Sequence, residues 1–141
     1  MDEALSTLIK EDAPLFSFDM GNPERSIAHK LGCYLQPLFE NRKVDCEYNR
    51  HLDEIKRSRK RTPIIPDIVI HDRKDDGNNL LVIEIKVNGD IEGIQEDIDK
   101  LIDLTDRVEE EGLRYDYGLF ILFNGIQWNL FWFEGGEMIP D

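Results

Sequence analysis

Cysteine and histidine are scarce in this chain of 141 residues, which holds two cysteines and three histidines. A disulfide framework needs more cysteine, and a structural zinc site needs cysteine or histidine at ligand spacing. The histidines form no such cluster, so neither kind of site is expected to organise the fold. We predict that Cys33 and Cys46 are small core residues.

Long apolar runs are also missing. No segment approaches the roughly 18 uninterrupted apolar residues of a membrane span, and the acidic start of the chain is unlike a signal peptide. We therefore expect a cytoplasmic protein without membrane association. Its length fits one domain, which we place at residues 22–141, after a helical or loosely packed lead-in at residues 1–21.

Positive charge is concentrated in one segment. The net charge is −13, yet residues 42–62 hold eight Lys and Arg against four Asp and Glu, while the rest of the chain holds nine against 26. The acidic body disfavours general affinity for nucleic acid. The basic segment is either a solvated loop or a surface for a phosphate backbone.

Apolar spacing predicts a mixed α/β protein. Residues 22–39 show helical spacing after Asn22 as N-cap and Pro23 as first helical residue, and Pro37 should end this helix. Residues 44–49 and the segment 64–88 have the character of strands. A second amphipathic helix follows, with Ile91, Ile94, Ile98, Leu101 and Ile102 on one face, and then two strands at 117–124 and 128–134. The predicted order is helix, three strands, helix, two strands, with a central mixed sheet flanked by helices.

Charged residues interrupt a hairpin that otherwise has the composition of a buried one. Asp67 opens its first strand, and Glu84 and Lys86 lie inside its second. Strand side chains alternate between faces, so Glu84 and Lys86 share one face. Because the second strand is apolar on both faces, it is predicted to be central, with these charges shielded from solvent.

A turn centred between Asp75 and Asp76 would place residue i opposite residue 151 − i, and therefore Asp67 opposite Glu84. Cross-strand neighbours have Cβ atoms about 5 Å apart, and like charges there are unfavourable. A shared proton or a divalent cation would relieve the repulsion, and Mg²⁺ prefers carboxylate oxygens. Lys86 would then lie beside a metal-bound water. The alternative is a structural ion pair between Glu84 and Lys86.

The sequence Pro66-Asp67, sixteen residues, then Glu84-Ile85-Lys86 resembles the PD-(D/E)xK nuclease superfamily, which has the restriction-endonuclease-like fold. The likeness covers roughly residues 22–134 and is nearest to small stand-alone bacterial members. It implies that Asp67, Glu84 and the Ile85 carbonyl bind Mg²⁺ or Mn²⁺. It also implies that Lys86 positions or activates the attacking water.

Family members often add an acid from the first helix, and Glu24 is the candidate because it lies within the apolar stripe of that helix. Its alternative role is to complement the helix dipole in the first turn. Gln95 is a possible polar group near the site, or else a surface glutamine. The basic segment offers candidate contacts to a nucleic-acid backbone: Lys56, Arg57, Arg59, Lys60 and Arg61.

These residues indicate a Mg²⁺-dependent nuclease that acts on nucleic acid, with DNA favoured over RNA. A different class of function is a binding or assembly module that keeps the fold, has little activity and turns its acidic surface to a protein partner. A third possibility is an acidic mimic of nucleic acid. The aromatic strands 117–124 and 128–134 are expected in the core, or partly against a second copy in a homodimer.

Overall fold

The computed structural model describes residues 1–17, 23–47, 50–51, 54–55, 65–73, 79–106 and 114–140. Its helices are α1 (Asp2–Asp12), α2 (Glu24–Leu35) and α3 (Ile91–Thr105), with 3-10 helices η1 (Ala13–Phe16) and η3 (Gln36–Leu38). Its strands are β1 (Lys43–Cys46), β2 (Arg50–His51), β3 (Glu54–Ile55), β4 (Ile68–His71), β5 (Leu81–Val87), β6 (Tyr117–Asn124), β7 (Gln127–Glu134) and β8 (Glu137–Met138).

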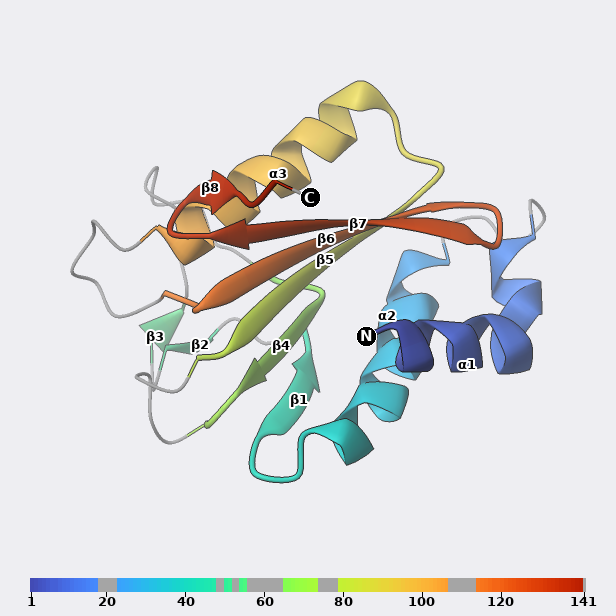
Figure 1. Cartoon of the computed structure of the whole chain (residues 1–141), viewed down its shortest axis with the longest axis horizontal. Helices are drawn as coiled ribbons and strands as arrows, with labels where there is room; N and C mark the ends of the chain where they lie inside the picture. The colour runs from blue at the N-terminus through green and yellow to red at the C-terminus, as the bar shows by residue number, and fades with distance from the viewer. Residues whose placement is uncertain are drawn as a thin grey trace.

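A six-stranded mixed sheet forms the middle layer, in the order β1-β4-β5-β6-β7-β8, and β2 and β3 pair separately. The β5–β6 pair is parallel and the other pairs are antiparallel. Helix α3 connects β5 to β6, since parallel strands need a crossover. Helices α1 and α2 pack on one face of the sheet and α3 packs on the other (Figure 1). The α/β class predicted from the sequence is therefore confirmed.

Strand β5 lies at the centre of this arrangement because it contributes apolar side chains to both faces. Leu81, Ile83 and Ile85 enter the core formed with α1 and α2, whereas Val82 enters the core formed with α3. Every residue from Leu81 to Ile85 is buried. The prediction that the second hairpin strand is central is confirmed, and Glu84 and Lys86 consequently lie on the face that α3 covers.

The observed order adds elements to the predicted one: α1 at the start, the short strands β2 and β3, and β8 at the end. Helix α1 is not a loose lead-in, because Leu5 and Leu8 are fully buried in the core shared with α2. The sequence left a helix and a loosely packed segment both open, because the contact of α1 with α2 brings together segments that are separate in the sequence.

Several local predictions need correction. Pro23 is the N-cap of α2 and Glu24 its first residue. Strand β1 covers Lys43–Cys46, whereas 44–49 was predicted, and residues 48–49 of that prediction lie outside the described residues. Ile91, predicted on the apolar face of α3, is 87% exposed because it occupies the first position of the helix, before the helix reaches the sheet. Both cysteines are free and exposed, so they are not core residues.

None of the helices in the described residues is both long enough and apolar enough to cross a membrane.

The contribution of α1 to the core gives a stability prediction. Leu5→Ala removes a fully buried side chain at the interface with α2, and we expect it to lower the free energy of unfolding by about 2–5 kcal/mol. Urea titration followed by circular dichroism measures the change. Ile126→Ala, at a position that is 57% exposed, is the control and should change stability by no more than about 0.5 kcal/mol. Equal effects of the two substitutions would contradict the burial of α1.

Candidate active site

The register of the β4–β5 hairpin brings two carboxylates together. The paired residues are Ile68 with Ile83, Val69 with Val82 and Ile70 with Leu81, so each pair of numbers adds to 151, as predicted. Extending this register by one residue places Asp67 opposite Glu84. Asp67 also crosses to β5 directly, because its Oδ2 accepts a hydrogen bond of 2.7 Å from the Ile85 N–H.

Glu84 is almost completely buried, with 1% of its surface exposed. It lies on the central strand, between β4 and the parallel strand β6, where its register partner is Phe120. Burial, followed by the nearby Asp67 charge, raises the pKa of Glu84 well above its ordinary value. Burial raises the pKa of Asp67 as well, against the lowering effect of the Ile85 N–H.

The two carboxyl groups lie close enough for each to shift the pKa of the other. Among the described residues, Glu84 Oε1 is buried and has no hydrogen-bond partner. An unpartnered buried oxygen is unusual in a folded protein and costs about 1–3 kcal/mol. The fold therefore buries an acceptor oxygen at a position where no described group donates a hydrogen bond to it.

Two lysines on the same side of the sheet are held by Asp97 of α3. The Lys86 Nζ lies 3.3 Å from Asp97 Oδ2, and the Lys100 Nζ lies 3.4 Å from Asp97 Oδ1. Partial burial acts to lower the pKa of Lys86, but the carboxylates of Asp97 and Glu24 outweigh it and the pKa is raised. For Lys100, burial is outweighed in the same way by Glu84 and Asp97, so its pKa is raised too. Both lysines are therefore protonated at neutral pH.

Glu24 reaches this region from the first turn of α2. Its Oε1 accepts a hydrogen bond of 3.2 Å from the Val87 N–H, and its Oε2 lies 4.0 Å from the Lys86 Nζ. Glu24 thus ties the start of α2 to the end of β5. The structure brings this predicted site residue to Lys86, and the side chain does more than complement the helix dipole.

Gln95 does not join the cluster. It is exposed on α3, and its amide Nε2 donates to Asp99 Oδ1 at 2.9 Å. Ile85 takes part through its backbone, since its side chain is buried on the opposite face in the core with α1 and α2. The predicted nucleic-acid contacts at residues 56–61 lie outside the described residues: Lys56, Arg57, Arg59, Lys60 and Arg61.

Asp97 and Lys100 were not predicted from the sequence. Asp97 follows Ile94 by three positions and precedes Leu101 by four, so it lies within the apolar stripe of α3. It is 5% exposed. An acid at such a position is a signal for a buried, partnered carboxylate, because buried acids are almost always paired.

The residues present fit a hard divalent cation with few protein ligands. No group of three or more His, Cys, Asp or Glu side chains able to hold a metal ion occurs in the described ranges. Mg²⁺, however, is commonly held by one or two carboxylates with water completing its shell. Asp67 and Glu84 supply two carboxylates, and Glu84 Oε1 is the unpartnered oxygen such an ion would use.

A second buried polar cluster lies along the same face. His71 Nε2 lies 2.8 Å from Asp45 Oδ2, which also accepts from Arg73 Nε at 2.8 Å. Hydrogen bonding from Arg73, and then from His71, outweighs burial and lowers the pKa of Asp45. These groups satisfy one another across β1 and β4, as expected of a structural cluster.

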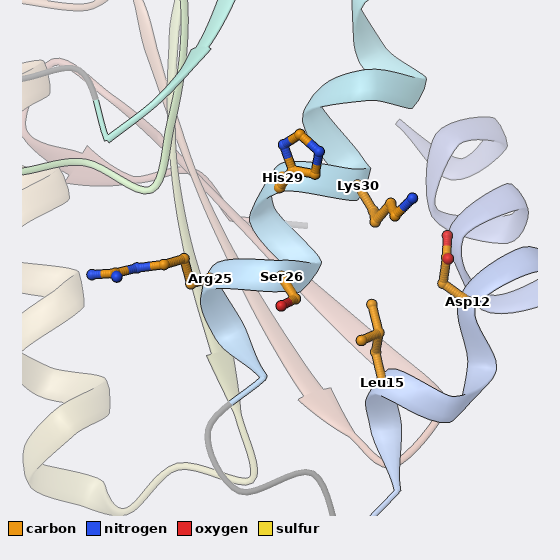
Figure 2. A pocket seen from close by; sticks show the side chains of 6 residues that line it. All are labelled: Asp12, Leu15, Arg25, Ser26, His29 and Lys30. Atoms are coloured by element: carbon orange, nitrogen blue, oxygen red, sulfur yellow. The ribbon is translucent and has the colours of Figure 1, made fainter.

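A hollow of about 340 Å³ lies between α1, η1 and α2. Figure 2 shows Lys30 of α2 and Asp12 of α1 on facing helices beside it. Its lining shares no residue with the carboxylate cluster: Asp12, Leu15, Arg25, Ser26, His29 and Lys30. It lies within the helical layer on the opposite side of the sheet from α3.

The raised pKa of Glu84 predicts a pH-dependent stability. The unfolded chain releases this proton near pH 4.3, whereas the folded protein retains it to higher pH, so ionisation of Glu84 lowers stability as the pH rises through that window. Glu84→Gln cannot ionise. In EDTA, we expect its melting temperature to exceed that of the wild type by a few degrees at pH 8, with the difference shrinking towards pH 4.

Melting curves from pH 4 to pH 8 test this expectation. Glu92→Gln, an exposed change on α3, is the matched control and should follow the wild type throughout. If the difference in melting temperature between Glu84→Gln and the wild type stays constant with pH, the Glu84 pKa is not raised.

Similarity to known proteins gives no independent assignment, because no family model, curated protein or solved structure matches this sequence. The resemblance to PD-(D/E)xK nucleases therefore rests on the motif residues themselves. Their chemistry in the fold is the basis on which a function is inferred.

Proposed function

We propose that this protein is a metal-dependent nuclease that hydrolyses phosphodiester bonds of nucleic acid, with DNA favoured over RNA. We further propose that its sheet and helices form a PD-(D/E)xK, restriction-endonuclease-like core. The observation that carries the proposal is the burial of Glu84 beside Asp67 with one carboxylate oxygen unpartnered. Such a costly arrangement is typical of a functional site.

Asp67 and Glu84 would hold Mg²⁺ or Mn²⁺, and the family resemblance adds the Ile85 carbonyl. When bound, the ion supplies a Lewis acid for the phosphoryl oxygen and lowers the pKa of a coordinated water. The Ile85 N–H holds Asp67 Oδ2 in place by its hydrogen bond. Rigid support of this kind keeps a ligand oxygen in position for its cation.

Lys86 would act as a hydrogen-bond donor and a positive charge beside the reacting phosphate. Its raised pKa favours the ammonium form at neutral pH, so it is suited to orient a water or stabilise negative charge. Glu24 supports Lys86 from α2, at 4.0 Å from its Nζ. The chemistry would be direct attack of water on phosphorus, which needs no covalent intermediate on the protein.

Binding of the polyanion would rely on the basic segment, because the body of the protein is acidic. Five basic residues precede Asp67 by six to eleven positions in the sequence: Lys56, Arg57, Arg59, Lys60 and Arg61. Positive charge placed next to an acidic site can guide a phosphate backbone towards it.

The contacts of Lys86 favour one alternative. Lys86 lies with Asp97 and Glu24 in an ion-pair network that could stabilise the fold by itself. A binding or assembly module with little activity would retain such a network and would present its acidic surface to a protein partner. This module predicts neither metal binding at Asp67 and Glu84 nor cleavage.

Cleavage assays separate the two functions. With Mg²⁺ or Mn²⁺, we expect the wild type to cut supercoiled plasmid or single-stranded DNA, and EDTA to stop the reaction. Asp67→Asn and Lys86→Ala should each lower the rate by at least about 100-fold, because each removes a group needed in the transition state. Asp99→Asn and Lys10→Ala change exposed residues and should cut like the wild type.

Calorimetry with Mn²⁺ supplies a second measurement. The wild type should bind Mn²⁺ and Asp67→Asn should not, whereas Lys86→Ala should still bind it. Absence of both cleavage and Mn²⁺ binding in the wild type would exclude the nuclease and favour the binding module.

The basic segment gives a separate prediction for binding. Replacing Arg59, Lys60 and Arg61 together by alanine should weaken DNA binding in Ca²⁺ and reduce the slope of log affinity against log salt by roughly 0.9 for each phosphate that the variant leaves unneutralised. Fluorescence anisotropy at several salt concentrations measures this slope. Lys10→Ala is the control, and an unchanged slope in the triple variant would rule out a role for the segment.

A further inference from the structure

Asp97 is a buried charged residue that was not predicted from the sequence. It lies inside the apolar stripe of α3, is 5% exposed and faces the sheet. Its two carboxylate oxygens contact different cations: Oδ2 contacts Lys86 on β5, and Oδ1 contacts Lys100 on α3 itself. Asp97 therefore links the strand that carries the predicted motif to the helix that covers it.

The connection between β5 and α3 passes close to the Lys86 side chain. A Cβ added at Gly89 would lie 2.2 Å from Lys86 Cγ and 2.6 Å from Cδ, so any larger residue there would displace the lysine. A Cβ at Gly93 would lie 3.5 Å from the Lys86 Nζ. The two glycines accommodate the lysine stem against the start of α3, and Asp97 receives its ammonium group at the far end.

Lys100 approaches the carboxylates from the helix side. Its side chain is 40% exposed, and the Glu84 and Asp97 charges both favour its protonated form. Asp97 lies three residues before Lys100, which places both on one side of α3. One buried carboxylate thus stands between two ammonium groups close to the Asp67–Glu84 pair.

We propose that Asp97 is a positioning residue of the site, which fixes the Lys86 and Lys100 ammonium groups beside Asp67 and Glu84. This inference rests on the proposed nuclease function for its catalytic consequence. Without the Asp97 charge, the nearest carboxylate to Lys86 among its ion pairs is Glu24, at 4.0 Å. The ammonium would then turn away from α3, and Lys100 would lose its ion pair.

Asp97→Asn tests the proposal because it keeps the shape of the side chain and removes its charge. We expect kcat to fall by about 10- to 100-fold, in the range found for supporting residues of a site, with little change in KM. Asp99→Asn makes the same chemical change at an exposed position two residues away and should leave kcat unchanged.

A double-mutant cycle shows whether Asp97 acts through the lysine. If it does, Asp97→Asn should lower the rate much less in a Lys86→Ala background than in the wild type. Equal fold-losses in both backgrounds would overturn the proposal.

Asp97→Glu, which keeps the charge but moves it by one methylene, should melt near the wild type and still have a reduced kcat. Full activity of Asp97→Glu would overturn the positioning role, because the position of the charge would then not matter.

Amine labelling followed by mass spectrometry measures the contact without any catalysis. Lys86 and Lys100 should react slowly in the wild type and several-fold faster in Asp97→Asn, relative to the exposed Lys10 in the same sample. Unchanged labelling of both lysines would overturn the proposal. If the wild type cuts no nucleic acid, the nuclease assignment fails, and labelling by itself decides whether Asp97 holds the two lysines.

Discussion

A carboxylate inside the central strand of a sheet is unfavourable unless positive charge or a proton comes to it, and Glu84 is such a carboxylate. It has strands on both sides and a helix above, and one of its oxygens has no partner among the described residues. Charged side chains lie around this group: Asp67 is its cross-strand neighbour in the extended hairpin register, and the charges of Asp67 and Lys100 both act on its pKa.

The surrounding charges form an alternating arrangement. Glu24, Lys86, Asp97 and Lys100 follow one another from α2 across β5 to α3, with each carboxylate in contact with at least one ammonium. These ion pairs connect α2, the sheet and α3. None of the ion pairs among the described residues involves Asp67 or Glu84. The ion pairs use oxygens of Glu24 and Asp97, whereas the proposed divalent ion would use oxygens of Asp67 and Glu84.

The distribution of charge along the chain is consistent with the proposal that one set of charges stabilises the fold and another would bind a cation and its phosphate. An acidic body keeps the protein from binding polyanions over its whole surface, so attraction would be limited to the basic segment before β4. The acidic groups at the site would favour a cation, and the cation would in turn allow a phosphate to approach. Substrate affinity would therefore depend on both the metal and the basic segment.

Alternation along a strand is a local property, so the sequence alone was enough to predict the hairpin register, the central place of β5 and the shared face of Glu84 and Lys86. It also indicated the α/β class through its order of helical and strand-like periods. Packing of the folded chain, by contrast, determined that Asp97 contacts both Lys86 and Lys100. A helix with acids around much of its surface does not reveal which of them will face the sheet, since this depends on how α3 packs on the face formed by β5, β6 and β7. The burial of α1 and the contact of Glu24 with Val87 arise in the same way, from segments that meet only when the chain has folded.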